Sequence, residues 1–167
     1  MPLAVLKPNN YGFGPTSIAI TIKNALDSIG WTTLIHGTTH GLVASRVNEA
    51  NIDSQPDVVI SILDDEYIIQ SRSLCRLRPK LIYVDPLFWF WDDRRMHSLS
   101  RLVDACTYVV LDFFDVKARA KLWRYPVTVI GPIVSSLAYQ FKHIPRVTGT
   151  EVVFLRGTPM DRSRATE

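Results

Sequence analysis

Two side chains of this sequence could move a proton at a substrate. His36 closes the strand-like run 32–36, and Asp85 follows the run 81–84, so both are expected at the carboxyl end of a strand. Imidazole titrates near neutral pH and can act as a general base, and a carboxylate can accept a proton from a substrate hydroxyl. Each has a structural alternative, because His36 has no evident orienting partner and Asp85 could instead cap the following segment. His36 and Asp85 are therefore the candidate catalytic residues.

A glycine-bearing segment, residues 9–15, lies between a strand-like run and a helix-like pattern. Gly12 and Gly14 can adopt backbone angles that other residues resist, and they would let a ligand approach the chain closely. The segment is not a dinucleotide fingerprint, because Ser17 stands in place of the third glycine and no acidic residue ends the second strand. A ligand-contacting loop is the functional hypothesis, and a tight turn is the alternative. The candidate binding residues are Asn10, Tyr11, Gly12 and Gly14.

An aromatic segment, residues 88–91, follows Asp85. Neighbouring side chains point in different directions, so all four rings cannot face one core. Aromatic faces bind sugar rings, flat ligands and partner proteins. Trp89 and Trp91 are therefore candidate substrate-binding residues, and the segment is also a candidate contact of a homodimer. The alternative is an apolar cover over the edge of the sheet.

Composition and spacing argue against several functional classes. The net charge of +3, from 19 basic and 16 acidic residues, provides no concentrated basic stripe for nucleic acid. No stretch approaches the roughly 18 consecutive apolar residues of a membrane span. His36 and His40 lack a third metal ligand, and Gly37 breaks the helical turn that would align them, so no metal site is predicted. Cysteines without a framework of close spacings favour a cytoplasmic location.

Strand-like and helix-like segments alternate along the chain. The strand-like runs are 3–7, 32–36, 58–63, 81–84, 108–111, 127–130 and 151–155, and the helix-like runs are 17–29, 40–50, 65–77, 96–104 and 114–123. Runs rich in valine and isoleucine suit a parallel sheet that is buried on both faces, with helices as crossovers. We predict an α/β fold: a Rossmann-like, doubly wound, mostly parallel sheet flanked by helices over residues 1–145. Residues 146–167 are interpreted as a linker, the start of a second-domain strand and a polar tail.

Four segments of the chain carry a resemblance to a known family. They are the strand, glycine loop and helix of Leu3–Ile29, the aspartate–aromatic segment Tyr83–Asp92, the strand and turn Val127–Val134, and the strand Glu151–Leu155. In this order they resemble the N-terminal, acceptor-binding domain of bacterial GT-B fold glycosyltransferases, followed by the first strand of the C-terminal domain. The resemblance spans roughly the whole chain.

The resemblance implies transfer of a sugar from a nucleotide sugar to a small-molecule acceptor, with inversion and without a metal doing the chemistry. It implies that this chain binds no cofactor and stays inactive until a second subunit or a missing C-terminal domain supplies the donor site. Many relatives carry a histidine base in the first loop, where this chain has Asn9, Asn10 and Tyr11. His36 and Asp85 are the substitutes. The alternatives are a stand-alone Rossmann-like binding or interaction protein and a small flavodoxin-like enzyme that uses a nucleotide.

Overall fold

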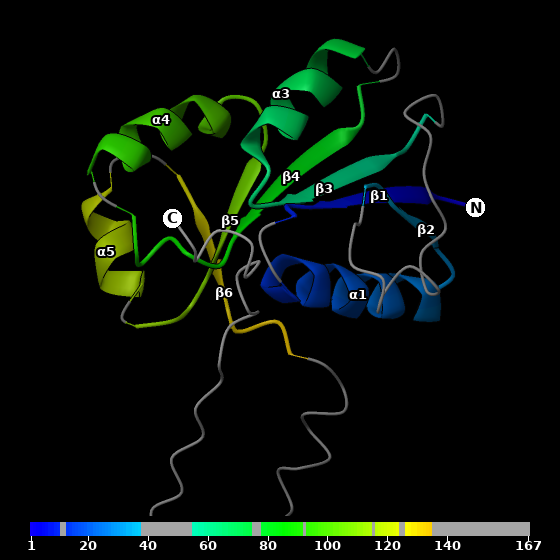
Figure 1. Ribbon diagram of the computed structural model, residues 1–167, viewed down its shortest axis with the longest axis horizontal. Helices are drawn as coiled ribbons and strands as arrows, with labels where there is room; N and C mark the ends of the chain where they lie inside the picture. Colours follow the sequence, from blue (N-terminus) through cyan, green and yellow to red (C-terminus); the bar gives the residue numbers. More distant parts are fainter. Residues whose placement is uncertain are drawn as a thin grey trace, which may run out of the picture.

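All the strands that the structure describes belong to one parallel sheet, in the order β2-β1-β3-β4-β5-β6 (Figure 1). The strands are β1 (Leu3–Pro8), β2 (Thr32–Ile35), β3 (Val58–Ile62), β4 (Lys80–Asp85), β5 (Thr107–Leu111) and β6 (Thr128–Ile130). Each neighbouring pair is parallel. The ends of each strand lie within one residue of those predicted from the sequence, so the predicted parallel sheet is confirmed.

The structure, a computed structural model, describes residues 1–10, 13–37, 55–74, 78–91, 93–114, 116–123 and 126–134. Three sequence predictions fall outside these ranges. They are the helix over 40–50, the strand over 151–155, and the division of the chain between residues 145 and 146.

Helices cover both faces of the sheet (Figure 1). The helices are α1 (Phe13–Ser28), α3 (Asp65–Leu74), α4 (Asp93–Val103) and α5 (Val116–Leu122). Ala19 of α1 packs against one face, in a core with Leu6, Ile35 and Ile62. The other three helices pack against the opposite face, in a second core that is rich in aromatic side chains. Helices on both faces of an all-parallel sheet confirm the Rossmann-like, doubly wound α/β fold.

The ends of α1 follow from its glycines and proline. The helix begins at Phe13, four residues before the predicted start, and Pro15 is its third residue. At the other end, Gly30 has a φ of 85°. Its N–H donates to the carbonyl of Asp27 at 3.1 Å, and that of Trp31 donates to the carbonyl of Leu26 at 3.1 Å. This pair of bonds is the Schellman motif, a helix end in which Gly30 supplies the left-handed conformation.

The start of α3 is set by acidic residues. The Oδ1 atom of Asp64 accepts a hydrogen bond from the backbone N–H of Tyr67 at 3.0 Å. This is an N-cap contact, which satisfies a donor that the helix itself leaves without a partner. Asp65 and Glu66 occupy the first turn, where the helix dipole favours negative charge. The cap places the Asp64 carboxylate at the carboxyl end of β3.

Candidate functional site

The chain changes its direction of travel across the sheet at β1. It passes from β1 to β2 on one side, and then returns past β1 to β3 on the other side. Ligands of open α/β sheets bind outside the carboxyl ends of the strands at such a switch point. Lys7 and Asn9 from β1 and its end, His36 after β2 and Asp64 after β3 lie at this edge. The switch point therefore gathers two charged and two polar side chains.

A row of polar side chains crosses the sheet close to this edge, on the face that α3 covers. The row consists of His36, Lys7, Ser61, Tyr83 and Tyr108. Lys7 lies opposite Ser61, and the pairing continues strand by strand to Tyr108. His36 joins the row because its N–H donates at 2.8 Å to the carbonyl of Leu6, the residue before Lys7. On the opposite face, Leu6, Ile35 and Ile62 lie next to this row and pack with α1 in an apolar core.

The ammonium group of Lys7 lies at the centre of a cluster of side chains. Its Nζ is 3.9 Å from Oδ2 of Asp64 and 5.7 Å from the ring centroid of Tyr67. The ring centroids of Tyr67 and His36 are 5.3 Å apart. We call Lys7, His36, Asp64 and Tyr67 the edge cluster. Gly37 has a φ of 69°, and a Cβ atom there would lie 2.7 Å from Nζ of Lys7, so the absence of a side chain makes room for the ammonium.

Hydrogen bonds to backbone carbonyls hold the ends of β1 and β3 together beside the edge cluster. Asn9 donates from its backbone N–H to the carbonyl of Ile62 at 2.8 Å and from Nδ2 to that of Leu63 at 2.9 Å. The hydroxyl of Ser61 donates to the carbonyl of Asp64 at 2.6 Å. Leu63 has a φ of 60°, in a region that side chains other than glycine rarely adopt. A strained backbone conformation persists only where the surrounding structure maintains it. Residues in such conformations are found preferentially at active sites and ligand sites.

The predicted glycine loop contributes less than the sequence suggested. Tyr11 and Gly12 lie outside the described residues, and Asn10 is exposed just after β1. Gly14 is part of α1 and does not have a positive φ, so it does not need the special backbone freedom expected of it. A Cβ atom at Gly14 would meet no heavy atom within 4 Å in this conformation.

Asp85 is buried at the end of β4, with 0% of its surface exposed. Its Oδ1 accepts from the backbone N–H of Leu87 at 2.8 Å, and its Oδ2 accepts from Nε1 of Trp91 at 2.8 Å and from Oη of Tyr108 at 2.6 Å. Burial raises the pKa of this carboxyl above its usual value, and the bonds from Tyr108 and Trp91 oppose that shift. A general base must reach a substrate hydroxyl, and this carboxylate instead caps the turn, as the structural alternative predicted.

Two arginines hold the turn over residues 86–91, which contains the aromatic segment. Arg95 forms two bonds to the Asp65 carboxylate, at 3.1 and 3.2 Å, and its guanidinium lies 5.4 Å from the ring centroid of Trp91. Arg119 donates to the carbonyls of Trp89, at 2.8 Å, and of Trp91. Although burial lowers it, the pKa of Arg95 is raised by Asp65, so this guanidinium stays charged. The turn is thereby tied to α3, α4 and α5.

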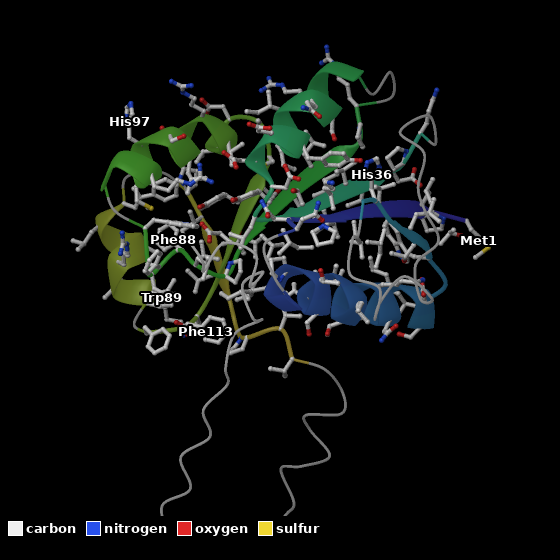
Figure 2. All side chains as sticks on the ribbon, in the orientation of Figure 1. Met1, His36, Phe88, Trp89, His97 and Phe113 are labelled. Carbon is white, nitrogen blue, oxygen red and sulfur yellow. The ribbon has the colours of Figure 1, made fainter. Side chains whose placement is uncertain are left out.

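The four aromatic side chains of the turn do not share one environment. Phe88 is 0% exposed and packs edge-on against Tyr108 and Trp123, whereas Phe90 is 65% exposed. This confirms that the four rings do not all face one core. Figure 2 shows His36 over β1 and β3, well apart from Phe88 and Trp89 beside α5. The structure therefore does not bring His36 together with the predicted binding residue Trp89.

The sequence analysis missed Lys7, Asp64 and Tyr67 as members of a site. The charge of Lys7 was the signal available in the sequence. A charged residue in an otherwise apolar, buried strand needs an oppositely charged or hydrogen-bonding partner. Asp64 caps α3, and its second contact, with Lys7, depends on the alignment of β1 and β3. His36 was identified, and its neighbours were not.

The chemical repertoire of the edge cluster is that of a polar ligand site. Lys7 can donate up to three hydrogen bonds, the Asp64 carboxylate can accept hydrogen bonds from a ligand, and the imidazole of His36 can donate and accept them. The side chains of Lys7 and Asp64 keep 15% and 22% of their surface exposed, so both remain within reach of solvent. Among the described residues, no group of three histidine, cysteine, aspartate or glutamate side chains is placed to hold a metal ion.

Comparison of the chain with family models, with curated proteins and with solved structures gave no match. In the part of the chain that the structure describes, none of the helices has the length and apolar character needed to cross a membrane. The resemblance to glycosyltransferases therefore rests on the sequence motifs alone.

Proposed function

We propose that this chain is the acceptor-binding half of a nucleotide-sugar-dependent glycosyltransferase, and that the acceptor binds at the edge cluster. The proposed location of the acceptor site rests on one observation. Lys7, His36 and Asp64 lie together at the switch point of the sheet. The choice of sugar transfer comes from the motif resemblance, since this fold serves many unrelated reactions.

The charges of the edge cluster favour an uncharged ligand rich in hydroxyl groups. The ammonium of Lys7 and the carboxylate of Asp64 are 3.9 Å apart, so their charges nearly cancel toward an approaching ligand. What remains is a set of hydrogen-bond donors and acceptors that suits a sugar or another polyol. In this proposal His36 takes the proton from the attacking acceptor hydroxyl, because a neutral imidazole has a ring nitrogen that can accept one.

The proposal places the donor site outside this chain. A second subunit or a C-terminal domain would hold the nucleotide sugar, and this chain would bind the acceptor without a cofactor of its own. Asp85 enters as the residue that holds the aromatic turn rather than as a base, since its carboxylate is buried and accepts hydrogen bonds on both oxygens.

Saturation-transfer NMR on the purified chain tests the proposal, with a panel of methyl glycosides and free polyols and with a separate panel of nucleotide sugars. We expect one class of polyol to bind weakly and the nucleotide sugars to remain unbound. Lys7→Met and His36→Gln should each weaken binding by at least about fivefold, the loss of one or two hydrogen bonds.

Lys80→Met is the matched control, because Lys80 is exposed at the amino end of β4, the opposite edge of the sheet. This variant should bind like the parent chain, and circular dichroism should show that all three variants are folded. Equal binding by Lys7→Met and the parent chain would contradict the location. Efficient sugar transfer by this chain without a partner would contradict its assignment as half of an enzyme.

A further inference from the structure

An apolar hollow lies on the α4–α5 side of the molecule, and the edge cluster contributes nothing to it. It has a volume of about 570 Å³. Its lining residues are Trp89, Met96, Phe114, Ala118, Arg119, Leu122 and Trp123, which we call the aromatic groove. Phe114 is 78% exposed and Leu122 is 88% exposed, so large apolar side chains stand at its rim. Exposed apolar surface of this kind around a hollow is typical of an interaction site.

The residue types of the aromatic groove match the core of a protein–protein interface. Tryptophan, phenylalanine, methionine and arginine are enriched there, and tryptophan and arginine dominate binding energy. Two tryptophans, Phe114, Met96 and Arg119 supply this set. The walls are also held in place: Arg119 is bonded to the carbonyl of Trp89 at 2.8 Å, and the ring centroids of Trp89 and Phe114 are 4.6 Å apart. A preorganised hollow lowers the entropic cost of binding.

The charge next to the groove is positive. α5 has Lys117, Arg119 and Lys121 and no acidic residue within its bounds. Lys117 lies 2.7 Å from the carboxylate of Asp112, which offsets one of these charges. A partner with carboxylates around its apolar contact is therefore the complementary one.

The same charge argues against two other occupants. A symmetric dimer through this face would bring the lysines of two α5 helices toward each other, which costs free energy. Residues 135–167 of this chain carry five basic and three acidic side chains. Their net charge is therefore positive, like that of the groove. A lipid surface would meet the cations, but a flat surface has nothing to fill a hollow of about 570 Å³.

We propose that the aromatic groove is the docking site for an acidic amphipathic helix of a partner protein. One large apolar side chain of that helix enters the hollow between Trp89 and Leu122, and carboxylates on its flanks face Lys121. This inference does not depend on the proposed sugar transfer.

A pair of designed helical peptides tests the proposal against the full chain. Both carry the same apolar stripe of Leu and Trp, and they differ only in flanking residues, which are Glu in one and Lys in the other. The indole N–H signals of Trp89 and Trp123 report binding by NMR. We expect the Glu peptide to shift both signals and to bind about tenfold more tightly than the Lys peptide at low salt.

Variants of exposed residues locate the contact without endangering the fold. Leu122→Ser and Lys121→Glu should each weaken binding of the Glu peptide by about tenfold, the effect of removing one interface contact. Ile69→Ser is the matched control, because Ile69 is 52% exposed on α3, away from the groove, and it should bind like the parent chain.

Four results would overturn the proposal. The first is no shift of the two indole signals, and the second is equal affinity for both peptides. The third is binding to phosphatidylglycerol-containing vesicles that Leu122→Ser abolishes, which would assign the groove to a lipid surface. The fourth is concentration-dependent dimerisation in sedimentation that Leu122→Ser abolishes, which would assign it to a second copy.

Discussion

The hydroxyl of Tyr108 is the sharpest test of how the aromatic turn is held. Its Oη donates to Oδ2 of Asp85 at 2.6 Å, and the two residues are 2% and 0% exposed. Tyr108→Phe removes this bond and leaves the ring, which stacks on Tyr83 at a centroid distance of 5.2 Å. Hydrogen bonds to charged groups contribute about 1.5–3 kcal/mol, so we expect the free energy of unfolding to fall by that amount and the Tm by about 3–12 °C.

The pH dependence of this loss follows from the pKa of Asp85. Burial raises it above the unfolded value, so the stability that this carboxyl contributes is present in acid and is lost as the pH rises through the folded pKa. The bond from Tyr108 lowers that folded pKa, and Tyr108→Phe should raise it further. The free energy of unfolding of the variant should therefore fall most at pH values at which Asp85 is ionised. The loss should shrink to about 0.5–1.5 kcal/mol, the contribution of a neutral hydrogen bond, once Asp85 is protonated.

Urea unfolding followed by far-UV circular dichroism, from neutral pH downward, measures both effects. A double-mutant cycle with Asp85→Asn isolates the contribution of the charge, because the carboxamide oxygen can still accept the bond but the group cannot ionise. A loss below about 0.5 kcal/mol at neutral pH, within the range of ordinary surface substitutions, would refute the role of this bond. A loss that grows in acid, or no coupling in the cycle, would refute the assignment of the effect to the Asp85 charge.

Two pairs of substitutions and one single substitution test the packing, the backbone and the helix cap by urea unfolding. Phe88→Ala should cost about 3–5 kcal/mol because its ring is fully buried, whereas Phe90→Ala should change stability by no more than about 0.5 kcal/mol; equal costs would contradict the described burial. Gly14→Ala should stabilise the chain by up to about 1 kcal/mol, because Gly14 is helical with open space around it, and Gly30→Ala should destabilise it, because φ is 85°; the opposite order would contradict the described backbone. Asp64→Ala should cost about 0.5–2 kcal/mol through loss of the N-cap, and an unchanged urea midpoint would exclude that cap.

Much of the fold could be predicted because its signals are local. In β3, Val59 and Ile60 are apolar and point to opposite faces, and only a strand covered on both sides buries them both. Gly30 ends α1 because a glycine adopts the left-handed conformation at little cost. The start of α1 was placed four residues late, because Phe13 and Gly14 were counted with the loop.

The candidate site was harder to predict because its members are distant in the sequence. His36 was recognised from its position after a strand, but its contact with Tyr67 depends on how α3 lies over the sheet. Asp85 was open to two interpretations in the sequence. Its burial and its bond to Tyr108 could not be foreseen from the sequence, because both depend on β5 lying beside β4.

The sequence by itself determined the alternation of strands and helices, the ends of each described strand to within one residue, and the α/β class. These follow from local periodicity and backbone preference, which neighbouring residues carry. Only the tertiary structure decided that Lys7, His36 and Asp64 meet at one edge, and that the aromatic turn divides between the core and an exposed groove. The physical reason is register: a shift of one residue between β1 and β3 would turn Lys7 or Ser61 to the opposite face, and no local pattern specifies that alignment.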